Sequence, residues 1–134
     1  MYLVSGFMLV SALARWRNLT ARQAVLLYLV VVGGLLAVLY AMPEVRRWLF
    51  AVVLILAIAI EMTFARALRK DVRTRYYLAG IVAKAVAFTI WNLDQHGAVC
   101  APESLIQGHA VWHLLGATSL WCTFLYYRSE RRLT

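Results

Sequence analysis

The sequence has few charged side chains, and very few acidic ones. Only 15% of the 134 residues are charged and six are Asp or Glu, whereas 63% are hydrophobic. A typical soluble domain has about 25% charged residues, and it could not cover this much apolar surface with so few polar groups. Disordered chains have the opposite composition, poor in apolar residues. The composition therefore predicts an integral membrane protein.

Cysteine is also scarce, and the basic residues have a simple explanation. The two cysteines, Cys100 and Cys122, are too few for a disulfide framework. The net charge of +8 would suggest nucleic acid as the partner of a soluble protein. In a membrane protein, short arginine-rich loops fix the topology instead. We therefore predict that the chain lies in a membrane and that it does not bind nucleic acid.

Long apolar runs indicate transmembrane helices. The alternation at period two that is typical of membrane barrels is absent. We predict an all-α membrane bundle of five transmembrane helices, which forms one domain over residues 1–134. The predicted helices cover residues 1–14, 24–41, 48–65, 76–91 and 108–127.

The basic residues predict the orientation of this bundle. Eleven Lys and Arg residues lie in the loops 15–23 and 66–75 and in the tail after residue 127, whereas only Arg46 and Arg47 lie on the opposite side. Because basic loops stay in the cytoplasm, the C-terminus is predicted to be cytoplasmic. The loop Asn92–Gln107 is then expected on the non-cytoplasmic side.

The first segment is short for a membrane helix. Its 14 residues would span roughly 21 Å, against about 30 Å of hydrocarbon. We expect that it is part of a longer helix and that the chain is truncated at its N-terminus. A secretory signal peptide is the alternative, because Ala12-Leu13-Ala14 resembles a cleavage site. However, no basic residue precedes the apolar run.

The residues with metal-binding chemistry begin the last helix. His109 and His113 are four residues apart, so that both imidazoles lie on one helix face. Two histidines in this pattern can bind the same zinc ion. The alternative is that they are hydrogen-bonded packing residues. Trp112 lies between them in sequence and is a candidate residue to line the site.

Two motifs near the C-terminus carry a resemblance to a known family. Trp91-Asn92-Leu93-Asp94, the following Cys100, and the run from Gly108 to Leu115 resemble the C-terminal signature of the alkaline ceramidases. That family is similar to a wider group of seven-helix membrane hydrolases, which includes the adiponectin-type receptors. The resemblance implies that the five segments match the last five helices of that bundle.

The resemblance also implies the chemistry. A zinc ion held by three histidines would hydrolyse the amide of ceramide to a sphingoid base and a fatty acid. His109 and His113 match the two ligands of the last helix, and Asp94 and Cys100 match an acidic and a cysteine position before it. The motif that supplies the first histidine has no match in this chain. His96 is the only other histidine and is a weak candidate for the third ligand.

The sequence thus predicts a ceramidase-like, zinc-dependent membrane hydrolase with a lipid substrate. Asp94 is a candidate catalytic residue that orients a histidine or transfers a proton, or else a solvated loop carboxylate. Two alternatives stay open: a non-catalytic member of the same superfamily, and a hydrolase or receptor of the wider group that acts on another lipid. Glu61 and Lys84 lie inside the apolar segments. We expect structural roles for both, either paired with each other or with Lys84 snorkelling.

Overall fold

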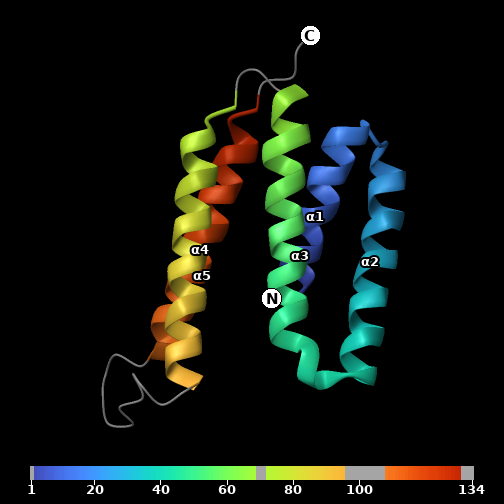
Figure 1. The fold of residues 1–134 in the computed structure, drawn as a ribbon. Helices are drawn as coiled ribbons and strands as arrows, with labels where there is room; N and C mark the ends of the chain where they lie inside the picture. The colour runs from blue at the N-terminus through green and yellow to red at the C-terminus, as the bar shows by residue number, and fades with distance from the viewer. Residues whose placement is uncertain (1, 69–71, 96–107, 131–134) are drawn as a thin grey trace. The chain divides into compact units, whose positions relative to one another are not determined.

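The computed structural model describes residues 2–68, 72–95 and 108–130, and all regular structure in these ranges is helical. Each of the five predicted segments forms a helix, which confirms the all-α class (Figure 1). The chain divides into two compact units, Met1–Lys70 and Asp71–Thr134. Three helices belong to the first unit and two to the second.

The first unit contains three long helices and three short turns. A 3₁₀ turn connects the second helix to the third, and the third helix continues into a π-helical turn and a second 3₁₀ turn. In order, the elements are α1 (Tyr2–Arg17), α2 (Ala21–Ala41), η1 (Pro43–Val45), α3 (Arg46–Ile60), η2 (Glu61–Ala65) and η3 (Arg66–Leu68).

The connection between α1 and α2 follows from its sequence. Asn18 adopts a left-handed conformation, with a φ of 52°, and the next amide, of Leu19, donates to the carbonyl of Ala14 at 2.9 Å. This geometry is a common way to end a helix, and asparagine tolerates it. Thr20 and Gln23 then form a capping box that starts α2. The chain therefore reverses direction in three residues between the two helices.

Helix α1 packs on both α2 and α3. Gly6 lies against α2, where an added Cβ would stand 3.5 Å from Val32 and 3.7 Å from Leu35. At the start of α1, the Tyr2 ring meets Phe50 of α3 edge-on, with 6.1 Å between centroids. The buried apolar residues of the unit include Met8, Val10, Ala12, Leu35, Phe50, Val53 and Ala57. Helix α1, which the sequence predicts to be short, thus packs against both of the other long helices of this unit.

The C-terminal part of the third segment departs from a regular α-helix. The amide of Arg66 donates to the carbonyl of Glu61, five residues earlier, and residues 61–65 form the π-helical turn η2. We predicted one helix through Ala65. The structure shows that the α-helix ends at Ile60 and that the wider turn follows it.

The second unit is an antiparallel pair, α4 (Thr74–Gln95) and α5 (Gly108–Arg128). Tyr77 contacts Tyr126 at one end of the pair and Trp91 contacts Trp112 at the other. The buried residues between these contacts, here called the α4–α5 seam, are mostly small. They are Gly80, Lys84 and Ala87 from α4, with Gly116, Ser119 and Thr123 from α5.

Glycine in the seam permits the close approach of the two helices. A Cβ added at Gly80 would stand 3.1 Å from the carbonyl oxygen of Ser119 and 3.3 Å from the side chains of Cys122 and Thr123. Small residues of this kind are enriched where membrane helices pack closely. The seam therefore has the composition expected of an interface between two transmembrane helices.

Three helical segments of the described chain are long and apolar enough to cross a membrane: Ala21–Ala41, Pro43–Leu68 and Thr74–Asp94. Helix α1 has only 16 residues, which span about 24 Å. Helix α5 has 21 residues, but its sequence includes polar side chains such as His113, Thr118 and Ser119. Length and composition thus support three of the five predicted spans.

Candidate functional site

The two motifs predicted to form the site lie close together in the second unit. The indole rings of Trp91, near the end of α4, and Trp112, in the second turn of α5, are stacked with 5.9 Å between centroids and 24° between planes. Residues 91–94 and 109–113 therefore lie at the same end of the α4–α5 pair.

Aromatic rings continue on both sides of this contact. Phe88 lies one turn before Trp91 on α4, with 5.8 Å between ring centroids. On α5, the ring of Trp112 contacts the imidazole of His113 at 4.5 Å and an interplanar angle of 60°. We call Phe88, Trp91, Trp112 and His113 the aromatic row. The row connects the last turns of α4 to a predicted zinc ligand.

The other predicted site residues are only partly described. The side chain of His113 is exposed. Asp94 is half-buried and lies three residues after Trp91, which places it on nearly the same helix face. The backbone of His109 belongs to α5, but its side chain lies outside the described part of the chain. His96 and Cys100 also lie outside it.

The donor set for zinc is therefore incomplete in the described residues. Within residues 2–68, 72–95 and 108–130, no group of three or more His, Cys, Asp or Glu side chains is placed to hold a metal ion. The side chains of His109, His96 and Cys100 lie outside these residues. His113 is thus the one predicted ligand whose side chain the structure places, and the zinc site stays a prediction.

Lys84 lies within the α4–α5 seam, away from the aromatic row. Its side chain is 6% exposed. The contacts Tyr77–Tyr126 and Trp91–Trp112 fix an antiparallel register that places position 84 opposite Ser119. Among the described residues, no hydrogen bond or ion pair involves Lys84. In this unit Asp94 is ten residues away along α4, about 15 Å at the helical rise, which is beyond the reach of the side chain.

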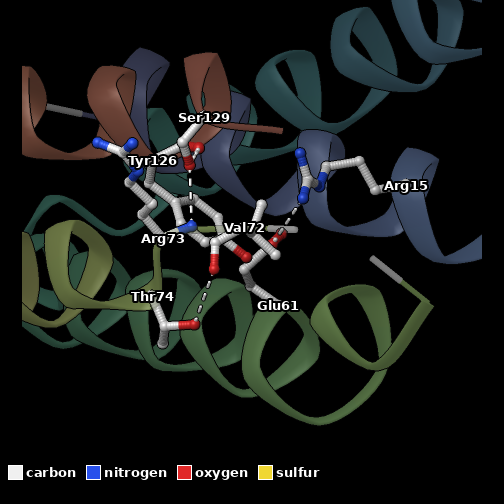
Figure 2. Close-up of polar contacts among 7 residues, drawn as sticks. All are labelled: Arg15, Glu61, Val72, Arg73, Thr74, Tyr126 and Ser129. Carbon is white, nitrogen blue, oxygen red and sulfur yellow. Dashed lines mark hydrogen bonds and ion pairs between the residues drawn. The ribbon is translucent and has the colours of Figure 1, made fainter. Parts of the chain in front are cut away.

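Glu61 pairs with a residue other than the one that we predicted. Its Oε1 lies 3.3 Å from an Nη of Arg15, and the Glu61 side chain is completely buried while that of Arg15 is 12% exposed (Figure 2). We considered Lys84 as its partner and assigned Arg15 to a loop. The structure places Arg15 in the last turn of α1 and pairs it with Glu61 at the π-helical turn.

Aromatic side chains flank this buried pair. The rings of Trp16 and Phe64 stack with 4.5 Å between centroids, and the guanidinium of Arg17 lies 4.3 Å from the Trp16 ring. A signal for the pairing was present in the sequence. An arginine ends the first apolar run and a glutamate lies near the end of the third, and helices that run parallel bring such ends together.

At the opposite end of the second unit, the hydrogen bonds of a serine connect the two helices. Ser129, just after α5, accepts a hydrogen bond from the amide of Arg73 at 2.9 Å and donates one to the carbonyl of Tyr126 at 2.7 Å (Figure 2). Arg73 directly precedes α4. The hydroxyl thus connects the start of α4 to the end of α5, far from the aromatic row.

Comparison with known proteins adds no assignment. No family model matches the chain, and neither the curated proteins nor the solved structures give a match. The resemblance to the alkaline ceramidases therefore depends on the sequence between Trp91 and Gly116 and on the number of apolar segments, and it stays a prediction.

Proposed function

We propose that all five helices cross a membrane and that the chain is a ceramidase-like hydrolase of lipid amides. The observation that carries the proposal is the stacking of Trp91 on Trp112 at 5.9 Å. The two motifs of the resemblance are separated by a loop in the sequence. Their helix ends meet in the structure, as residues of one site must.

The distribution of charge supports the orientation of this proposal. In the first unit, Arg15, at the end of α1, lies beside Glu61, near the end of α3, so that the basic ends of α1 and α3 coincide. In the second unit, Ser129 connects the basic start of α4 to the end of α5. Of the described basic residues in the first unit, only Arg46 and Arg47 lie at the other end. We assign the more basic end of each unit to the cytoplasm. Trp91 and His113 are then on the non-cytoplasmic side.

The aromatic row and its neighbours suit a lipid substrate. Leu93 and Leu114 lie beside the predicted site residues and are exposed, at 43% and 69%. Apolar side chains exposed at a membrane-facing site provide a path for acyl chains that arrive laterally between lipids. Trp91 and Trp112 have the size and the polar N–H of residues enriched at the membrane surface.

The residues available have distinct roles in amide hydrolysis. His109 and His113 are the proposed zinc ligands, and the exposed imidazole of His113 fits such a role. Zinc bound there would polarise the amide carbonyl and activate water. Asp94, on the same end of the unit, would accept a hydrogen bond from a histidine or take up a proton. A catalytic zinc needs three protein ligands, and His96 is the remaining histidine of this chain.

Zinc content tests the metal part of the proposal. Zinc should co-purify with the full chain in detergent, and His109→Ala or His113→Ala should each remove most of it, because a single imidazole holds zinc weakly. His96→Ala is the informative third variant, since it retains zinc unless His96 is a ligand. Equal zinc content in wild type and in the His109 and His113 variants would contradict the metal site.

Product analysis tests the reaction. The full chain, incubated with ceramide in mixed micelles, should release equal amounts of fatty acid and long-chain base, and His113→Ala should abolish the release. A chain that binds zinc but releases neither product from ceramide, although it cleaves another lipid amide or ester, would belong to the wider hydrolase group. A chain that binds zinc and cleaves no lipid would be a non-catalytic relative.

Thiol labelling tests the orientation. In the Cys122→Ser background, an impermeant maleimide added to intact cells should label Cys100. In a Cys100→Ser, Cys122→Ser background, Arg128→Cys should be labelled only after the cells are permeabilised. Position 128 is exposed in the structure, so burial would not mask it. Labelling of Arg128→Cys in intact cells would reverse the proposed topology.

A further inference from the structure

The aromatic row suggests a role for a tryptophan that lies on a different helix from both predicted zinc ligands. Trp91 is half-buried on α4. Its ring contacts Phe88 of its own helix at 5.8 Å and Trp112 of α5 at 5.9 Å. The ring of Trp112 in turn lies 4.5 Å from the imidazole of His113. A row of ring contacts therefore leads from α4 to His113.

We propose that Trp91 is a positioning residue for the imidazole of His113 and acts through the indole of Trp112. This inference rests on the proposed function, in which His113 binds zinc. It assigns to α4 a part in a metal site whose two predicted ligands, His109 and His113, belong to α5.

Helix geometry explains why Trp112 needs a neighbour from α4. Consecutive residues of an α-helix point about 100° apart, so the rings of Trp112 and His113 meet only when the Trp112 side chain leans toward His113. The indole of Trp91, stacked at 24°, limits the positions that Trp112 can adopt. The tilted contact of 60° between Trp112 and His113 then restricts the rotamers of the exposed imidazole.

The end of the α4–α5 pair that holds the aromatic row is packed differently from the rest of the pair. Elsewhere the seam is made mostly of small residues, and at Gly80 the backbones approach so closely that a Cβ would stand 3.1 Å from a carbonyl oxygen. At Trp91 and Trp112 two large rings fill the interface instead. The seam brings the helices together, and the aromatic pair sets the orientation of the first turns of α5.

Residues that orient metal ligands without touching the metal change affinity about 10–100-fold when they are replaced. An imidazole whose rotamer is already restricted also loses less conformational entropy on binding. We therefore expect Trp91→Leu to lower the zinc affinity of the full chain about tenfold. Trp91→Phe keeps a ring against Trp112 and should retain most of the affinity.

The experiment compares three variants of the full chain in detergent: Trp91→Leu, Trp91→Phe and the control Trp121→Leu. Trp121 lies on α5, is 60% exposed, and has a ring contact with Phe124 of the same helix. Zinc affinity is measured by competition with a chelator. The ring resonances of His113, assigned with His113→Ala, are measured by NMR without metal, because they report the ring current of Trp112.

The expected result is that Trp91→Leu moves the His113 resonances and weakens zinc binding, whereas Trp91→Phe and Trp121→Leu leave both close to wild type. Unchanged His113 resonances and zinc affinity in Trp91→Leu would overturn the inference. If Trp91→Leu does not fold, Trp91→Met replaces it in the same comparison. If the wild type binds no zinc, the proposed function fails, while the NMR comparison still decides whether Trp91 positions His113.

Discussion

The two units of the chain bury a charged side chain in different ways. In the first unit, the completely buried Glu61 lies 3.3 Å from Arg15 of a neighbouring helix. In the second, Lys84 is 6% exposed within a seam of small residues, and no ion pair involves it in the described chain. Removal of one partner from a buried pair destabilises the fold because it leaves an uncompensated charge, whereas removal of a buried charge that has no partner relieves a cost. Removal of the buried charge is therefore expected to lower the stability of the first unit and to raise that of the second.

The largest effect should come from breaking the buried pair of the first unit. Glu61→Gln leaves the guanidinium of Arg15 buried without its carboxylate, and we expect a loss of about 3 kcal/mol in the free energy of unfolding. The double variant Arg15→Met, Glu61→Leu should recover most of this loss. Reversible denaturation in mixed micelles measures both. Glu44→Gln, at an exposed position, is the matched control, and an equal loss there would argue against the pair.

A smaller effect should follow when the seam of the second unit is widened. Gly80→Val places branched carbons where even a Cβ would be 3.1 Å from the Ser119 carbonyl, so α4 and α5 must separate, at a cost of about 2 kcal/mol. Gly33→Ala is the control, because nothing lies within 4 Å of its added Cβ. If both substitutions have the same effect on unfolding, the seam is not closely packed.

Removal of the buried amine should stabilise the second unit. Lys84→Met has a similar volume and no charge, and we expect the free energy of unfolding to rise by about 1 kcal/mol. The same methionine at Val82, which is 62% exposed on the same helix, should change little. A clear loss of stability in Lys84→Met would show that the amine has a partner in the folded protein. The two units would then not differ in how they bury a charged side chain.

The smallest effect should come from the serine that connects the ends of the second unit. Ser129→Ala removes the acceptor of the Arg73 amide and the donor to the Tyr126 carbonyl, which we expect to cost about 1 kcal/mol. Ser129→Thr keeps the hydroxyl and should restore most of it. Faster hydrogen exchange of the Arg73 amide in the alanine variant alone would locate the change. Unaltered exchange would contradict the connection.

The helices were predictable because long apolar runs in a chain with so little charge have few other solutions. The five segments coincide with five helices, and local signals explain some of the differences at their ends. Thr20 and Gln23, for example, start α2 three residues earlier than apolar character alone suggests. Tertiary partners were not predictable in this way. The sequence shows that Arg15 follows an apolar run, but only the packing of α1 on α3 determines that it faces Glu61.

The candidate site was predictable to a similar degree. Helical spacing placed His109 and His113 on one face of a helix, and the resemblance grouped them with Asp94 and Trp91. The contact between Trp91 and Trp112 required the structure, because nothing in the sequence specifies the register of two antiparallel helices joined by a long loop. The side chains of His109, His96 and Cys100 lie outside the described residues, and their roles stay predictions.

The π-helical turn at residues 61–65 also bears on how sequences similar to this one should be compared with it. Its hydrogen bond from Arg66 to Glu61 encloses one residue more than an α-helical bond does. Deletion of a single residue here would restore a continuous α-helix and leave the segment long enough to cross a membrane. Because five residues of this turn occupy about the place of four residues in an α-helix, the side chains before and after the deletion would keep nearly the same faces. A homologue aligned with a one-residue gap after Glu61 should therefore have a continuous α-helix here and still direct the carboxylate at this position toward Arg15.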